Sequence, residues 1–173
     1  MVQTYPEDQT LDADGYRRNV GIVLSNPQGQ VFWARRIRHD GWQFPQGGIQ
    51  ADETSEQAMF RELQEETGLS EMKVHVIGRT RDWLRYDLPE RYQRSGCKQV
   101  FRGQKQRWYL LKLTADESAI CLNASERPEF DQWCWVNYWF PLDEIVKFKR
   151  EVYQHALLEL APLLFNGRPD RQG

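Results

Sequence analysis

The chain has 173 residues, a length that fits one domain with a core large enough to fold alone. Seven tryptophans, seven tyrosines and eight phenylalanines exclude an intrinsically disordered chain, which would have too little apolar surface to form a core. The formal net charge of −2 excludes little by itself, so the distribution of the charges matters more than their sum.

The first half of the chain alternates short apolar segments with turns. Residues 1–13 are expected to be an N-terminal tail, and residues 19–24 and 30–35 are predicted strands joined by a turn at residues 26–29. A helix is predicted after Gly47-Gly48. Its start has the capping-box spacing of Thr54 and Gln57, and Gly68 stands where a C-cap glycine is expected.

The second half adds strands and a second helix. We expect strands at residues 74–78, 108–113 and 132–136, and an amphipathic helix at residues 146–165. Residues 80–105 are polar and basic, and a loop of that length in a compact domain is usually functional. This order predicts the α+β class, with a domain at residues 14–165 and a C-terminal tail at residues 166–173.

Charged residues are segregated along the chain. Residues 17–38 contain five arginines and no acid, and residues 79–107 contain nine lysines or arginines against three acids. Residues 52–71 contain seven acids against one arginine. Two basic stretches and one acidic stretch in a small domain suggest an anionic ligand that meets a bound cation.

Several other classes of protein are excluded. Cys97, Cys121 and Cys134 form no close pair and no Cys/His cluster of the kind that binds zinc. The polar, acidic N-terminus does not resemble a signal peptide, and no apolar run is long enough to span a membrane. We therefore expect a cytoplasmic protein with reduced thiols, and no arrangement of residues supports a covalent nucleophile.

The acidic stretch predicts a metal site on the first helix. At about 100° per residue, Glu62, Glu65 and Glu66 fall within an arc of roughly 100°, on a different but adjacent side from Met59 and Leu63. Such like charges repel one another, and a hard divalent cation such as Mg²⁺ would turn the repulsion into binding. Three glutamates alone would more simply form a solvated acidic face, so the hypothesis depends on the residues around them.

Those residues fit one pattern without a mismatch: G-x5-E-x7-R-E-U-x-E-E-x-G-U, where U is aliphatic, running from Gly47 to Leu69. This pattern is the signature of the Nudix hydrolases, which the chain resembles here. The resemblance implies an α/β/α sandwich around a mixed β-sheet, with the signature forming a loop–helix–loop metal site. It also implies hydrolysis of a phosphoanhydride bond in a nucleoside diphosphate derivative.

The resemblance further implies a set of metal ligands. Glu62, Glu65 and Glu66 would hold two or more Mg²⁺ ions, or alternatively Mn²⁺, with help from the Gly47 carbonyl and from Glu129 outside the signature. Bound metal ions neutralise phosphate charge and activate a water molecule. The sequence leaves open which glutamate accepts the proton, and Glu129 taken alone would be read as a surface residue.

Two more residues of the signature have an implied supporting role. Arg61 and Glu53 would form a pair that holds the loop–helix–loop together and keeps the catalytic glutamates in place.

Segments outside the signature narrow the resemblance to one subfamily. Residues 15–21, 42–48, 128–133 and 148–153 are similar to bacterial RNA pyrophosphohydrolases and to the related dinucleoside polyphosphate hydrolases, and the similarity spans about residues 14–164. The first group removes pyrophosphate from triphosphorylated RNA with an unpaired 5′ end, and the resulting monophosphate end promotes mRNA decay.

The substrate contacts that this resemblance implies are spread over the chain. They come from Arg17, Arg36, Gly41, Tyr86, Lys105, Val146, Phe148 and Lys149. Single-stranded RNA is commonly bound by bases stacked on arginine and aromatic side chains, which suits this set. Two positions depart from the subfamily: Arg18 stands where a proline is common, and Gly41 where a small polar residue is expected.

Two rival functions stay open on the residues alone. One is an enzyme for small substrates such as diadenosine polyphosphates or free nucleotides, because the same site chemistry would serve them. The other is a binding module that kept the fold and lost catalysis, although the complete set of glutamates disfavours it. We expect a monomer that binds RNA and no membrane, and no motif identifies a regulatory protein partner.

Overall fold

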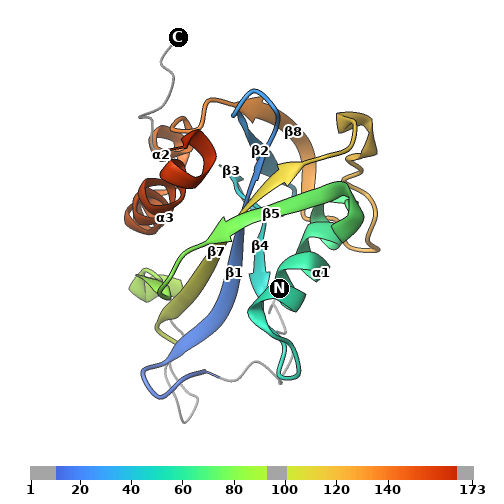
Figure 1. Ribbon diagram of the computed structural model, residues 1–173. Coiled ribbons are helices and arrows are strands. Elements are labelled where there is room, and N and C mark those ends of the chain that lie inside the picture. Colours follow the sequence, from blue (N-terminus) through green and yellow to red (C-terminus); the bar gives the residue numbers. More distant parts are fainter. Residues whose placement is uncertain (1–10, 93–100, 167–173) are drawn as a thin grey trace.

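The computed structural model describes residues 11–92 and 101–166, which form one mixed β-sheet with helices on both faces (Figure 1). This arrangement confirms the predicted α+β sandwich. Expectations for residues 1–10, 93–100 and 167–173, which include most of both tails and Cys97, lie outside the described residues. Among the described helices, none is both long and apolar enough to cross a membrane.

The sheet is built around two long parallel strands. β1 (Tyr16–Ser25) and β7 (Gly103–Leu113) pair in register from Tyr16 opposite Gly103 to Ser25 opposite Lys112. The shorter strands are β2 (Val31–Arg36), β3 (Trp42–Gln43), β4 (Gln46–Gly48), β5 (Val74–Arg79), β6 (Leu84–Asp87) and β8 (Phe130–Val136).

The neighbours of these two strands change along their length. Where β1 and β7 begin, β4 pairs with β1 and β6 pairs with β7. Where they end, β2 pairs with β1 and β5 pairs with β7, while β8 continues the sheet beyond β2. The first halves of β1 and β7 therefore lie between β4 and β6 and form a four-stranded part of the same sheet.

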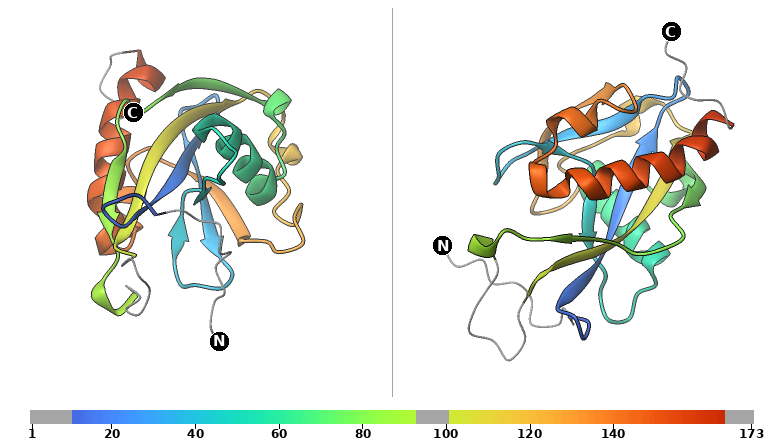
Figure 2. Two further views of the ribbon diagram at one scale, coloured as in Figure 1. Left: turned by 90° about the horizontal axis from the view of Figure 1, so that it is seen from below. Right: turned by 90° about the vertical axis from the view of Figure 1, so that its left-hand side faces the viewer.

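Two long helices cover opposite faces of the sheet (Figure 2). α1 (Ser55–Thr67) packs on the face that carries Val20 and Ile22, and α3 (Lys147–Phe165) packs on the face that carries Val23. Alternation along β1 supplies both cores, because successive side chains of a strand point to opposite faces. A short helix, α2 (Pro141–Glu144), precedes α3.

The first helix has the ends that the sequence predicts. The Thr54 hydroxyl accepts a hydrogen bond from the Gln57 amide, and the Gln57 side chain accepts one from the Thr54 amide, so the capping box is confirmed. Gly68 ends the helix with a left-handed φ of 74°. A Cβ at this position would also lie 2.8 Å from the backbone oxygen of Cys121, so close approach reinforces the need for glycine.

The expected loop at residues 80–105 is wrong in part. The segment contains β6, a 3-10 turn at Glu90–Tyr92 and the beginning of β7. β6 forms because its backbone pairs with the first residues of β7, and such a non-local pairing leaves little trace in a polar sequence. β1 likewise begins at Tyr16, three residues earlier than expected, because β7 completes its hydrogen bonds.

Candidate metal and substrate site

Arg61 of α1 joins the glycine-rich strand to the helix. Its Nε donates to Glu53 Oε2 at 2.7 Å, and its Nη2 donates to Glu53 Oε1 at 2.9 Å and to the Gly48 carbonyl at 2.8 Å. Its Nη1 donates to Glu62 at 2.8 Å and, more loosely, to Glu65 at 3.4 Å. These hydrogen bonds lower the pKa of Glu53 and hold the loop before α1 against the helix.

The three glutamates do not share one exposed face, contrary to the simple helical projection. Glu62 and Glu66 are 8% and 7% exposed because they pack against β4, where Glu66 Oε2 accepts a hydrogen bond from the Gln46 amide at 3.1 Å. Only the Glu65 side chain is half exposed. A helix that packs against a strand can bury polar positions that a projection places beside its apolar face.

Burial changes the acidity of both inner glutamates. It raises the pKa of Glu62 to about 7, although Arg61 opposes the shift. The pKa of Glu66 lies well above its ordinary value, because the side chain is buried and the negative charges of Glu62 and Glu129 add to the cost of ionisation. Both carboxylates therefore need a compensating positive charge to be ionised in the folded protein.

The donor set fits a hard divalent cation, since it consists of carboxylate oxygens that are costly to ionise alone. In residues 11–92 and 101–166, however, no group of three acidic, histidine or cysteine side chains is close enough together to hold a metal ion. Arg61 is paired with Glu62, and Arg36 with Glu129 at 3.2 Å. In this structure, guanidinium groups provide the positive charge beside these carboxylates.

Glu129 reaches the site through the pairing of β2 with β8. Arg36 and Arg38 each donate to its carboxylate at 3.2 Å, and the Ile37 amide donates to its backbone carbonyl at 2.9 Å. The register of β8 shifts opposite Arg35 and Arg36, so that Asp131 has no partner residue in the ladder. This irregularity brings Glu129 beside Arg36, as a β-bulge commonly does next to a functional site.

β4 separates two oppositely charged groups. A Cβ added at Gly47 would lie 1.9 Å from Cδ of Glu62, and a Cβ added at Gly48 would lie 2.1 Å from Nη2 of Arg17. Because adjacent residues of a strand point to opposite faces, Glu62 and Arg17 pack on opposite sides of β4. The positive charge of Arg17 still acts across the strand and opposes part of the rise in the pKa of Glu62.

Aromatic and cationic side chains meet on the Arg17 side of the sheet. The rings of Tyr86 and Phe148 are 6.0 Å apart, and Lys149 Nζ lies 5.7 Å from the Tyr86 ring. Lys149 is 6% exposed and donates to Gln43 Oε1 at 3.1 Å. Burial, with a contribution from Arg36, lowers the pKa of Lys149 to about 7.

Two expected substrate residues accept backbone hydrogen bonds beside this cluster, Val146 from the Lys149 amide at 3.0 Å and Gly41 from the Arg36 amide. Val146 is the N-cap of α3 and is 42% exposed. Gly41 turns the chain between β2 and β3 with a φ of 97°, and its carbonyl accepts a hydrogen bond from the Arg36 amide at 3.1 Å. A Cβ at Gly41 would meet nothing within 4 Å, so the backbone angle, not space, favours glycine.

Lys105 is the expected substrate residue that the structure does not bring to the others. The strand register pairs Gln104 with Arg17 and with Tyr86, whereas Lys105 pairs with Arg18 and Arg85. Lys105 therefore points to the other face of the sheet, where it binds Asp12 at 2.8 Å. The alternation of β7 would have revealed this, but the strand was expected to begin only at residue 108.

A buried amide network beside the glutamates was not predicted. Gln106 Nε2 donates to Asn19 Oδ1 at 2.9 Å and to Gln46 Oε1 at 3.3 Å, and the Gln46 amide in turn binds Glu66. Asn19 and Gln106 are 2% and 0% exposed. Buried polar groups need partners, so polar residues next to the apolar runs of two strands were the available signal.

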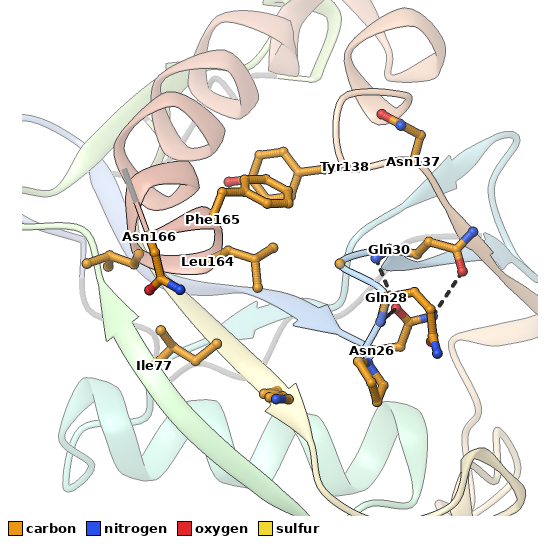
Figure 3. Close-up of a pocket in the computed structure, with 13 residues that line it drawn as sticks. Asn26, Gln28, Gln30, Ile77, Asn137, Tyr138, Leu164, Phe165 and Asn166 are labelled. Atoms are coloured by element: carbon orange, nitrogen blue, oxygen red, sulfur yellow. Dashed lines mark hydrogen bonds between the residues drawn. The ribbon is translucent and has the colours of Figure 1, made fainter. Parts of the chain in front are cut away.

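A surface hollow of about 700 Å³ lies elsewhere (Figure 3). It is lined by residues 26–30, Ile77, Lys112, Asn137, Tyr138 and residues 163–166. Amide side chains of the turn between β1 and β2 face apolar side chains at the end of α3. None of the expected site residues lines this hollow, so it is separate from the glutamates.

Known proteins resemble this chain over nearly its whole length. The family model described as the NUDIX domain matches residues 15–160. The RNA pyrophosphohydrolase of Hahella chejuensis is 59% identical over 155 residues, which cover 90% of this chain and 96% of that protein. The RNA pyrophosphohydrolase of Methylococcus capsulatus is 58% identical over 159 residues, which cover 92% of this chain and 83% of that protein.

Solved structures share the fold at low sequence identity. The E. coli dihydroneopterin triphosphate pyrophosphohydrolase superposes with a TM-score of 0.63 at 16% identity, covering 82% of this chain and 95% of that one. A C. elegans Ap4A hydrolase in a binary complex superposes with a TM-score of 0.58 at 17% identity, covering 83% and 97%. At these identities the likeness concerns the fold alone.

Proposed function

The chain belongs to the NUDIX domain family, and on that premise we propose that it removes pyrophosphate from the 5′ end of triphosphorylated RNA. The single observation that carries the proposal is identity of 58% or more, over about nine tenths of the chain, to proteins named RNA pyrophosphohydrolase. The family match confirms the resemblance inferred from the signature between Gly47 and Leu69. The products are RNA with a 5′ monophosphate and pyrophosphate or two phosphates, and the monophosphate end promotes mRNA decay.

In the proposed site, Glu62, Glu65, Glu66, Glu129 and the Gly47 carbonyl would hold two or more divalent ions, with Mg²⁺ preferred and Mn²⁺ as a substitute. When bound, such ions neutralise charge on the phosphate oxygens and lower the pKa of a water molecule. The two buried carboxylates support this assignment, since a cation would offset their cost of ionisation.

The chain's own residues then divide the remaining tasks. Arg17 binds the 5′ phosphates from the other side of β4, and Arg61 orients Glu62. Glu65 is half exposed and only loosely bound to Arg61, so it is the glutamate best placed to accept a proton from the attacking water.

A base near the 5′ end is proposed to bind beside Phe148. The partly buried Phe148 supplies aromatic surface next to the buried ring of Tyr86. Arg36 supplies positive charge, and Lys149 adds to it below its pKa of about 7. Stacking on such side chains is the usual way in which single-stranded RNA is held. The proposed working state is a monomer, and the proposed place of action is the cytoplasm.

The rival substrate class is tested by direct competition. Triphosphorylated RNA of a few nucleotides and diadenosine tetraphosphate are offered together with magnesium, and the two rates are compared. We expect the RNA to be hydrolysed with the higher kcat/KM. Rates that strongly favour the dinucleotide would overturn the assignment to RNA and leave the phosphoanhydride chemistry in place.

A further inference from the structure

Positive side chains lie side by side on the face of the sheet opposite Arg17 and Tyr86. The strand register places Arg18 of β1 next to Lys105 of β7, and Lys105 next to Arg85 of β6. Arg107 lies two residues further along β7 and therefore on the same face. We call Arg18, Lys105, Arg85 and Arg107 the rear basic row. Like charges directly opposite each other on neighbouring strands destabilise a sheet, so this arrangement needs an explanation.

Aromatic rings hold three of these cations in place. Arg107 Cζ lies 4.6 Å from the centre of the Trp83 ring, and Lys105 Nζ lies 5.7 Å from the same ring. Arg85 Cζ lies 4.9 Å from the centre of the Tyr16 ring. In such cation–π contacts the flat face of a guanidinium group lies against the ring. The N–H donors at the edge of the group are then left for an anion.

The acidic side chains nearby neutralise only part of the row. Asp12 binds Lys105 at 2.8 Å, and Asp14 lies 3.8 Å from Arg85. Within the described residues, neither Arg18 nor Arg107 has an acidic partner within 4.0 Å. The row therefore keeps positive charge and donors for a further anion.

We propose that the rear basic row binds phosphates of the RNA chain downstream of its 5′ end. The inference rests on the proposed function, which makes a polyanion the substrate of this domain. Tyr86 and Arg85 are neighbours on β6 but face opposite sides of the sheet. Among the described strands β6 pairs only with β7, so RNA that leaves the Tyr86 side around β6 reaches the row.

RNA fits this surface better than an acidic protein segment does. A guanidinium group can donate two parallel hydrogen bonds to two oxygens of one phosphate. Aromatic side chains between cations are typical of surfaces that bind single-stranded nucleic acid. The row also crosses three strands instead of forming one isolated ion pair, which suits a chain of repeated charges.

The test compares RNA lengths in a double variant, Arg18→Gln with Arg85→Gln. Hydrolysis is measured on a triphosphorylated dinucleotide and on a long unstructured RNA with the same 5′ end. We expect kcat/KM to fall about 10-fold on the long RNA and to stay unchanged on the dinucleotide. The matched control is Lys73→Gln with Lys112→Gln, which removes two exposed cations outside the row and should affect neither substrate.

Binding without turnover separates this inference from the proposed function. The affinity for long RNA with a 5′ monophosphate should fall in the double variant, and the slope of log affinity against log salt should become shallower by about 1.4. Equal losses on both RNA lengths, or no loss on either, would overturn the inference. So would unchanged RNA affinity combined with lost binding to polyglutamate. A wild-type protein that binds long RNA through the row but does not hydrolyse triphosphate ends would overturn only the proposed function.

Discussion

The two sides of β4 differ in charge although one strand separates them. Glu62 and Glu66 of α1 are buried against one side, and Arg17 of β1 packs against the other. The absence of side chains at Gly47 and Gly48 lets both groups approach the backbone. The groups proposed for chemistry and for phosphate binding are therefore carried by different elements, so each can be changed without moving the other.

The largest expected effect is on the acidic side. Glu65→Gln should lower kcat at least about 100-fold, because the variant loses a carboxylate proposed to bind metal and accept a proton. The melting temperature should barely change, since the side chain is half exposed. Glu56→Gln, at an exposed position of the same helix, is the control. An unchanged rate in Glu65→Gln would remove this residue from the mechanism.

An intermediate effect is expected when one methyl group is added to β4, at Gly47 on one side of the strand or at Gly48 on the other. Gly47→Ala should displace Glu62 and lower kcat, whereas Gly48→Ala should displace Arg17 and raise KM for triphosphorylated RNA. Each change should be about 10- to 100-fold, as small misplacements of reacting groups commonly cost that much. Steady-state kinetics are measured for both variants, and each variant is the control for the other. The same change of kcat and KM in both would contradict the separation of the two sides.

The smallest expected effect is on how the free energy of unfolding of the metal-free protein depends on pH. Titrating groups on the two sides of the sheet should give this dependence slopes of opposite sign. The raised pKa of Glu62 means that ionisation is costlier in the folded state, so its contribution to stability falls as pH rises from about 4.5 to about 7. The lowered pKa of Lys149 means that protonation is costlier in the folded state, so its contribution falls as pH drops from about 10.5 to about 7.

Urea unfolding across both pH ranges measures these slopes. Glu62→Gln should remove part of the acidic-range slope, and Lys149→Met part of the basic-range slope, each by up to about 1.4 kcal/mol per pH unit. Each variant serves as the control for the other, because their ranges meet near pH 7. A Lys149→Met protein that keeps the wild-type slope above pH 7 would show that this lysine is not the group that titrates there.

The first helix and its surroundings were predictable from sequence because they depend on short-range interactions. The Thr54 capping box and the Gly68 C-cap join residues only a few positions apart. The pairing of Glu53 with Arg61 is also local, and it accompanies the signature from which the family was identified. By contrast, β6 was missed because its partner β7 lies many residues later, and pairing creates the strand.

By itself, the sequence determined the family, the α+β class and the set of glutamates, because the signature spacing and the helix caps are local patterns. Only the tertiary structure decided which of those residues share a site. The β2–β8 pairing brings Glu129 to Arg36, whereas the register of β1, β7 and β6 turns Lys105 away from Tyr86. Strand register is set by contacts between distant segments, and a shift of one residue moves a side chain to the other face.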